Sequence, residues 1–285
     1  MRLGVPKALH YYYHFPAWKE FLENKGYTIV VSEETTRETI GKGLRVAPPE
    51  ICLPVKVYLG HCASLQKKCD ALFVPRLVCC LVNKKVYYGC PKVIGLPDLV
   101  RATFPKVKIW ELTIDERKNP RHGLNLRISR EKKGNDTAST FDNRQPFLPT
   151  IMLIGHPYLL YDRAINFDLI ERIREKGITL FTPFDYWPID LPQWDKSPFL
   201  EISWFYERHL IKAAFAAQKR KGCGIILFYS FGCGTSAVTN ELILREIAQP
   251  AGIPVLNLIV DEHTQEGGFW TRVESFLEIL ARRGR

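Results

Sequence analysis

The chain has 285 residues, enough for one large domain or two ordinary ones. Its hydrophobic fraction of 46% and charged fraction of 25% are those of a globular protein and exclude a chain that is disordered throughout. No segment reaches the ~18–20 uncharged apolar residues of a membrane span. Residues 1–7 meet a charge and a proline before any long apolar run, unlike a signal peptide. We therefore expect no membrane association and a cytoplasmic location.

The net charge is +10, from 40 Lys and Arg against 30 Asp and Glu. A basic chain can bind nucleic acid, acidic partners or phosphorylated ligands. No helix-turn-helix, zinc-finger or RNA-recognition signature accompanies the charge. We therefore expect that nucleic acid is not the ligand.

The first part of the chain alternates strand and helix patterns. β-Branched and apolar runs bounded by Gly or Pro indicate strands, and apolar residues at helical spacing indicate helices. The predicted order is a strand at 2–5, a helix at 12–24, a strand at 27–31, helices at 35–42 and 53–68, a strand at 70–75, a helix at 97–104 and a strand at 107–112. Strands that alternate with helices predict a parallel sheet covered on both faces.

Residues 116–148 interrupt this alternation with a polar, basic stretch that indicates a linker. The alternation then starts again, with a strand at 150–154, a helix at 166–176, a strand at 178–181, a helix at 201–221, a strand at 224–231, a helix at 237–248, a strand at 255–260 and a helix at 268–282. We therefore predict an α/β protein of two doubly wound domains, 1–115 and 149–285, with a cleft between them.

The chain has eight cysteines, more than packing in a reducing compartment requires, so metal or redox chemistry is considered first. Ligands of open α/β sheets bind where strands end and helices begin. Cys52 precedes a predicted helix, Cys90 follows the strand at 70–75 in a loop, and Cys233 stands between a strand and a helix. A helix N-terminus favours negative charge, whether a thiolate or an anionic cluster.

The remaining cysteines are assigned to packing, with one reserve. Cys62 falls inside a predicted helix, and Cys69 and Cys223 lie at strand entrances, on the opposite edge from the predicted cleft. Cys79 and Cys80 are adjacent and point in different directions, so one of them can reach the cleft. Cys79 is therefore kept as a reserve ligand.

The spacing of the cysteines in the sequence distinguishes between a zinc site and an iron–sulfur site. A zinc site usually shows short C-x₂₋₄-C pairs, whereas Cys52, Cys90 and Cys233 are separated by 38 and 143 positions. Iron–sulfur clusters accept thiolates from distant loops, and three thiolates leave one iron of a four-iron cluster open to another ligand. Spacing alone leaves an equal alternative, in which the three cysteines are unrelated residues of tight turns.

An ordered set of short motifs carries a family resemblance. The motifs lie at 4–9, 11–13, 15–18, 52–56, 60–61, 90–92 and 95–98, and then at 155–158, 161–162, 166, 232–234 and 261–264. On these residues the chain resembles the acyl-CoA dehydratase activase-related family over nearly its whole length except the linker. That family is similar in turn to the cluster-bearing subunits of 2-hydroxyacyl-CoA dehydratases and to double-cubane cluster proteins.

The resemblance implies two flavodoxin-like domains with an iron–sulfur cluster in the cleft. The family's cysteine motifs fall on Cys52, Cys90 and Cys233 and imply a [4Fe–4S] cluster, or a double-cubane [8Fe–9S] cluster as in the second group of relatives. In the dehydratase relatives the cluster receives an electron from an ATP-hydrolysing activase and serves radical dehydration of a 2-hydroxyacyl-CoA. In the double-cubane relatives paired cubanes reduce small molecules.

The resemblance also implies partners. The chain has no G-x-x-x-x-G-K-[ST] motif and no dinucleotide fingerprint. An ATP-dependent activase would therefore be a separate chain. A second copy of this chain, or a related subunit, is a further expected partner.

Five polar residues are candidates for catalysis. Glu50 and Lys56 flank the first cysteine motif, and Lys56 would lie on the first turn of its helix, where it neutralises a cluster or stays solvated. His156 follows a strand and can donate a proton, bind a metal, or be satisfied by backbone bonds. Glu262 and His263 follow the last strand and can anchor a substrate or belong to a cap of the final helix.

Three further groups have structural interpretations. Arg76 follows the predicted strand end at Pro75 and is expected to point into the cleft. His10 and His14, with the tyrosines between them, are expected to be aromatic packing at a helix start. The tryptophans at 187, 194 and 204 are expected to form a lid of the cleft or a dimer contact.

Two functions from different classes follow. The first is an iron–sulfur component of electron-transfer, reductase or dehydratase chemistry that works with an activase. The second is an α/β binding or scaffold module of such a system, which holds no cluster. Iron content after purification without oxygen distinguishes the two.

Overall fold

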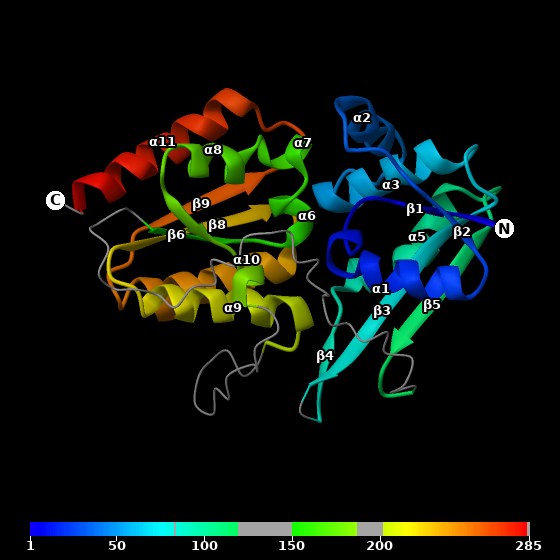
Figure 1. The fold of residues 1–285 in the computed structure, drawn as a ribbon, viewed down its shortest axis with the longest axis horizontal. Helices are drawn as coiled ribbons and strands as arrows, with labels where there is room; N and C mark the ends of the chain where they lie inside the picture. Colours follow the sequence, from blue (N-terminus) through cyan, green and yellow to red (C-terminus); the bar gives the residue numbers. More distant parts are fainter. Residues whose placement is uncertain (83, 119–149, 187–201, 284–285) are drawn as a thin grey trace.

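The structure is a computed structural model that describes residues 1–82, 84–118, 150–186 and 202–283. It contains two sheets that lie side by side, one built by residues 2–115 and the other by residues 150–260 (Figure 1). The predicted linker at 116–148 lies outside the described residues from 119 onward, so its role as a domain boundary stays a prediction. The predicted α/β class with two parallel-strand sheets is confirmed.

The first sheet has the strand order β2-β1-β3, with β5 parallel to β3 on its other side and β4 antiparallel to the far end of β3. The strands are β1 (Arg2–Val5), β2 (Thr28–Val31), β3 (Ala71–Val82), β4 (Lys85–Tyr88) and β5 (Ile109–Asp115). The helices are α1 (Tyr11–Asn24), α2 (Arg37–Val46), α3 (Leu53–Leu65), α4 (Pro91–Ile94) and α5 (Leu96–Thr103). The parallel strands thus follow the order second-first-third-fourth, which is the flavodoxin-like arrangement.

The second sheet repeats this order with β7-β6-β8-β9, and all its pairings are parallel. Its strands are β6 (Thr150–Ile154), β7 (Thr179–Phe181), β8 (Cys223–Ser230) and β9 (Val255–Val260). The helical elements are α6 (Pro157–Leu160), α7 (Arg163–Asn166), α8 (Leu169–Glu175), η1 (Pro183–Tyr186), α9 (Phe205–Gln218), α10 (Gly234–Ile243), η3 (Leu244–Ala248) and α11 (Glu266–Arg283). The carboxyl ends of β8 and β9 point toward the first domain (Figure 1).

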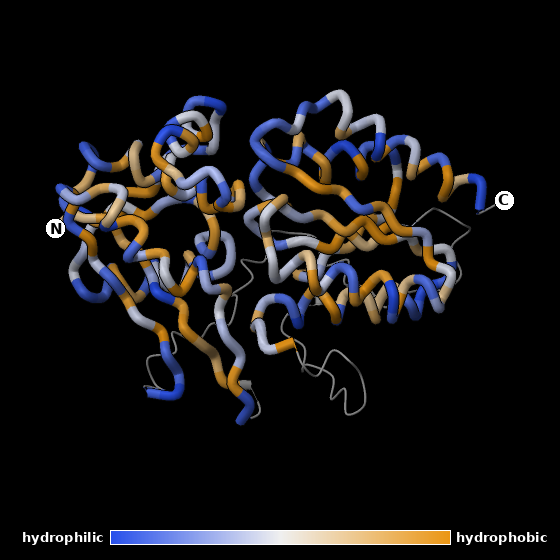
Figure 2. Tube along the Cα trace, turned by 180° about the vertical axis from the view of Figure 1, so that it is seen from behind, coloured by the Kyte–Doolittle hydropathy of each residue, from blue (hydrophilic) through white to orange (hydrophobic). Residues whose placement is uncertain are grey.

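Alternation along the strands divides each core into two layers. In β8, Ile226 and Phe228 pack with α8 and α11, whereas Ile225 and Leu227 pack with α9 and α10. In β3, Leu72 faces α3 and Phe73 faces α1. Successive side chains of a strand point to opposite faces, and both faces are covered, so these strands are continuously apolar in sequence. Figure 2 shows these apolar strands between helices with mixed surfaces.

The predicted end of the strand at Pro75 is wrong, because β3 continues to Val82 and pairs with β4. Beyond Leu72 the strand leaves β1 and keeps β5 as its parallel neighbour, so a proline without an N–H is tolerated at Pro75. Arg76 therefore does not mark a strand end. Its guanidinium pairs with Asp98 and Glu111, at 2.7 and 2.6 Å.

None of the described helices combines the length with the apolar composition needed to cross a bilayer.

Candidate functional site

A cavity opens between the two domains at the carboxyl ends of the sheets, and Cys52, Cys90 and Cys233 all line it. Two of these cysteines come from the first domain and one from the second. Around them, Leu9, Pro54, Val55, Val93, Leu159 and Trp204 form apolar walls. The three cysteines selected by their places in the sequence therefore share one site in space.

Each of the three cysteines is the residue that immediately precedes a helix. Cys52 precedes α3, Cys90 precedes α4 and Cys233 precedes α10, and none of the thiols makes a capping hydrogen bond to the backbone of its helix, although Cys233 Sγ donates to the Ser236 hydroxyl within α10. Pro54 and Pro91 occupy the first helical turns, where a missing N–H has no cost. The thiols are thus free to point into the cavity, and the amino-terminal ends of α3 and α10 favour negative charge there.

The two domains make close contact beside the cysteines. The backbone N–H of Leu53 donates to Ser230 Oγ at 3.2 Å, which ties the start of α3 to the end of β8. Gly232 has φ +73°, and a side chain there would stand 3.6 Å from the carbonyl oxygen of Glu50. Lys92 Nζ donates to the Gly232 carbonyl at 2.7 Å. These contacts hold the loop that carries Cys233 against the loop that carries Cys52.

The thiols influence one another electrostatically. Burial raises the pKa of Cys52 to about 11, with smaller raising effects from Cys233 and Cys90 and a lowering effect from Lys92. Burial also raises the pKa of Cys90, and Cys233 adds to this. Without a bound cation, Cys52 and Cys90 are therefore protonated at neutral pH. Binding of a metal group must release these protons, which makes loading pH-dependent.

A buried polar chain lies beside Cys233 and joins both domains. Tyr13 Oη lies 2.8 Å from His156 Nδ1, and His156 Nε2 lies 3.1 Å from Glu207 Oε1. Ser236 Oγ also donates to Glu207 Oε1 at 3.1 Å, and Cys233 Sγ donates to Ser236 Oγ at 3.2 Å. The side chains of His156 and Glu207 are 6% and 2% exposed, so the chain is shielded from bulk water.

The protonation of this chain follows from its surroundings. Burial raises the pKa of Tyr13 well above its usual value, so its hydroxyl keeps its proton and can donate to His156 Nδ1. Because a carboxylate can only accept, His156 Nε2 is the donor in its contact with Glu207. Burial alone would raise the pKa of Glu207, but His156, Thr235 and Ser236 hold it below the ordinary value. Glu207 is therefore a carboxylate that accepts from several donors.

The donor chemistry of the cavity fits an iron–sulfur cluster. Three thiols with apolar surroundings, from loops distant in sequence, are the ligand type that such clusters use. Within the described ranges, no three His, Cys, Asp or Glu side chains are grouped to hold one metal ion. A cluster distributes its thiolates over several irons, so it does not require that grouping.

The sequence comparisons concern the first domain. Residues 2–133 match the family model described as "CoA enzyme activase uncharacterised domain". This match covers somewhat less than half of the chain, and it includes Cys52 and Cys90 but not Cys233. It supports a relationship to CoA-enzyme activase-related proteins. No curated protein matches the chain.

Of the five candidate polar residues, one lines the cavity and four do not. His156 lines the cavity and makes the contacts described above. Lys56 is buried and pairs with Glu262 at 2.5 Å, and neither residue lines the cavity. Glu50 and His263 are exposed and also lie outside the lining. The geometry therefore leaves His156 as the member of this set that faces the cysteines.

The other cysteines lie away from the cavity lining. Cys79 donates to Asp115 Oδ1 at 3.1 Å, and Cys80 packs in an apolar cluster with Tyr87 and Val93. The three cysteines assigned to packing, Cys62, Cys69 and Cys223, lie in or against the apolar cores. Neither Cys79 nor Cys80 is placed to complete the site.

Several cavity residues escaped the sequence analysis. Tyr206 and Glu207 belong to the first turn of α9, which the sequence shows only as a long helix. Ser236 and Thr235 follow Cys233 in the first turn of α10. The sequence gives one indication of Glu207, which is that an acidic residue lies on the buried side of α9. Of the three tryptophans assigned to a lid or a dimer contact, Trp204 lines the cavity, and the other two lie outside the described residues.

Proposed function

We propose that this protein is an iron–sulfur protein that holds a [4Fe–4S]-type cluster in the interdomain cavity through Cys52, Cys90 and Cys233. The observation that carries the proposal is the convergence of three free thiols, each at a helix start, on one apolar cavity. When bound, such a cluster supplies one-electron chemistry. The eight cysteines, all described, form no disulfide, which suits the reducing cytoplasm.

We further propose that the protein acts in electron transfer or in reductive or dehydratase chemistry with a separate ATP-dependent activase. The match of residues 2–133 to a CoA enzyme activase family model supports a role in such a system. The chain's own residues would shield the site from water through the apolar walls and keep His156 oriented by Tyr13 and Glu207. His156 Nε2–H and the Glu207 carboxylate can then hold a proton near the reacting group.

The experiment is elemental analysis of protein purified and reconstituted without oxygen. About four irons and four acid-labile sulfides per chain, with a broad charge-transfer absorption, support a cubane. A ratio near eight irons to nine sulfides supports a double cubane. Absence of iron and sulfide would overturn the proposal and favour a binding or scaffold module.

Single substitutions identify the ligands. Cys52→Ser, Cys90→Ser and Cys233→Ser are each expected to lower iron content strongly. Cys69→Ser is the matched control, because Cys69 lies outside the cavity and a serine can donate to the Leu65 carbonyl as the thiol does. Equal iron content in all four variants would reject this ligand set even if the protein binds a cluster.

A further inference from the structure

His10 lines the interdomain cavity, and both nitrogens of its imidazole are buried without a hydrogen-bond partner among the described residues. Its side chain belongs to the cavity lining together with the three cysteines, and the residue is 5% exposed. Neither Nδ1 nor Nε2 has a partner among the described residues. Buried polar groups are nearly always paired, so an imidazole with two unpaired nitrogens calls for an explanation.

The local backbone keeps His10 in this position. His10 immediately precedes α1, but its side chain does not cap that helix. Leu9 before it adopts φ +49°, a left-handed conformation that a branched side chain disfavours. Tyr206 stacks on the imidazole, with ring centroids 4.8 Å apart. The ring is thus positioned by the backbone and by Tyr206, and the stacking does not satisfy its nitrogens.

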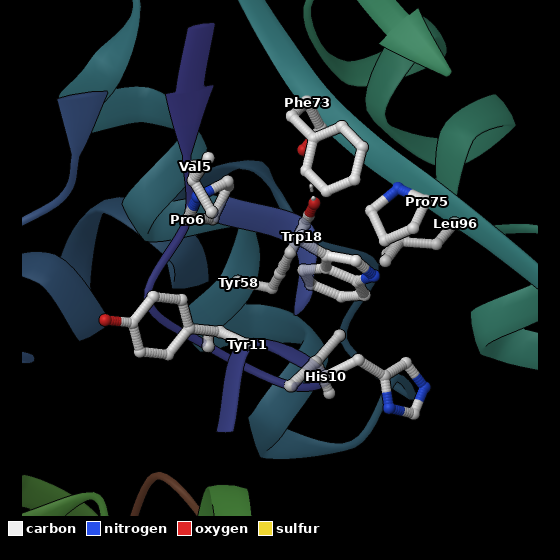
Figure 3. Close-up of a pocket in the computed structure, with 11 residues that line it drawn as sticks. Val5, Pro6, His10, Tyr11, Trp18, Tyr58, Phe73, Pro75 and Leu96 are labelled. Atoms are coloured by element: carbon white, nitrogen blue, oxygen red, sulfur yellow. Dashed lines mark hydrogen bonds between the residues drawn. The ribbon is translucent and has the colours of Figure 1, made fainter. Parts of the chain in front are cut away.

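The neighbouring cavity of the first domain does not supply partners either. That cavity is lined mainly by apolar and aromatic side chains, among them Val5, Pro6, Trp18 and Phe73. Figure 3 shows the imidazole of His10 turned away from Tyr11 and from the wall formed by Val5 and Pro6. His10 itself also belongs to the lining of this cavity, but its nitrogens are turned away from these walls.

The charge state of His10 determines what it can offer a ligand. Burial lowers its pKa well below the ordinary value, and His14 and His156 lower it further. The ring is therefore neutral and carries one N–H donor. Glu207, on the same cavity, is a carboxylate that can only accept. Sulfur atoms held by three cysteines are acceptors, so the imidazole N–H is complementary to them and the carboxylate is not.

We propose that His10 donates its N–H to a sulfur of the group held by Cys52, Cys90 and Cys233 and thereby raises the reduction potential of that group. The inference rests on the proposed function. A hydrogen bond to a cluster sulfur stabilises the reduced form, which carries more negative charge. The bond also satisfies a buried donor that the described residues leave unpaired. His10 is accordingly a positioning and tuning residue rather than a ligand.

The test compares the midpoint potential of the reconstituted wild type with those of His10→Phe, His10→Asn and His10→Gln. Phe keeps the stacking on Tyr206 and removes both nitrogens. The expected result is unchanged iron content, a more negative potential for His10→Phe, and recovery toward the wild-type potential in one of the two amide variants. The apo-form of His10→Phe is expected to be at least as heat-stable as the wild-type apo-form, because no unpaired polar atom is buried.

His14→Phe is the matched control. His14 is equally buried but lies outside the cavity lining, and its Nε2 is 2.5 Å from Tyr206 Oη. This variant is expected to lose thermal stability and to keep the wild-type potential. If His10 had only a structural role, His10→Phe would also lose thermal stability and keep the wild-type potential.

Each of the following results would overturn the inference. An unchanged potential in His10→Phe would show that no such hydrogen bond exists. Loss of iron from a folded His10→Phe would show that the imidazole is a ligand or an assembly requirement. Wild-type protein without iron would reject the proposed function and this inference with it, and that failure is recognised before any variant is made. If His10→Phe does not fold, His10→Leu takes its place, and either a wild-type potential or a loss of iron in that folded variant would equally reject the inference.

Discussion

Lys56 Nζ and Glu262 Oε1 lie 2.5 Å apart and form an ion pair that joins α3 of the first domain to the turn after β9 of the second. The side chain of Lys56 is 4% exposed and that of Glu262 is 19% exposed. Lys56 also donates to the Pro49 carbonyl at 2.8 Å. The turn itself is closed by Thr264, which bonds to Asp261 at 2.9 Å. The segment at 261–264 thus serves to hold the domains together.

Replacement of Lys56 by Met is therefore expected to destabilise the protein by about 2 kcal/mol. This value lies between the ~3–5 kcal/mol for breaking a fully buried pair and the ~1 kcal/mol or less of an exposed one. The loss has a clear cause, because Glu262 keeps its charge without a partner. Denaturant unfolding measures it, with Arg245→Met as a control in an exposed pair with Glu241. Equal losses in the two variants would contradict the prediction.

Asp162 should make stability depend on pH between about 4 and 6. Burial raises the pKa of Asp162 to about 6, while Thr35 and the N–H of Ala164 act in the opposite direction. Because the folded pKa lies above the unfolded value of 3.8, the folded protein binds this proton more tightly. The contribution of Asp162 is therefore favourable below pH 4 and is lost as pH rises to about 6, by on the order of 3 kcal/mol.

Asp162→Asn removes this titration and can retain the cap of α7. Between pH 4 and 6, the free energy of unfolding of Asp162→Asn should rise relative to that of the wild type. Above pH 6 the difference between the two should stay constant. Unfolding curves at several pH values measure the difference. Asp70→Asn is the control, because Asp70 is exposed and its pKa is lowered, mainly by its bonds to Arg2. A parallel pH profile for wild type and Asp162→Asn would disprove the assignment.

Gly43 and Gly60 allow α2 and α3 to touch through their backbones. A Cβ at Gly43 would lie 1.9 Å from the Lys56 carbonyl oxygen, and one at Gly60 would lie 2.0 Å from that of Thr39. Gly43→Ala is expected to cost about 3 kcal/mol, at the upper end of the usual range for overpacking. Because Cys52 immediately precedes α3, the same change should lower incorporation of the proposed cluster.

Gly41→Ala is a control on the same helix. Its Cβ would find its nearest neighbour, Arg45 Nη1, at 3.8 Å. Alanine is a better helix former than glycine, so this variant should be more stable by roughly 0.5–1 kcal/mol. Thermal unfolding measures the stability of both variants. A similar effect of the two alanines would show that α2 and α3 separate without cost.

The sequence and the structure agree where local chemistry determines position. Cys52, Cys90 and Cys233 were selected because a turn followed by a helix start places a side chain at the sheet's carboxyl edge, and all three line one cavity. Long-range partners could not be predicted this way. Lys56 and Glu262 meet across 206 positions, and their pairing removes both from the cavity.

The role of His10 could not be predicted from the sequence either. Its neighbours in sequence are aromatic, and the expectation of packing is correct in part, since Tyr206 stacks on it. The unpaired nitrogens are visible only when the whole surroundings are known. Pro75 is a similar case. The sequence shows that it lacks an N–H, which predicts a strand end, but it does not show that β3 pairs with β5 and no longer with β1 at this position.

Removal of the metal should weaken the association of the domains. The proposed ligands Cys52 and Cys90 belong to the first domain and Cys233 to the second, so a bound cluster crosslinks the two. A group that binds only the folded form stabilises it. The reconstituted protein should therefore unfold at a higher temperature than the iron-free form, by about 2–4 °C for each kcal/mol of coupling. Cys233→Ser should unfold at the same temperature with and without iron treatment. Anaerobic thermal scans measure these midpoints, and identical values for loaded and iron-free wild type would contradict a cluster that bridges the domains.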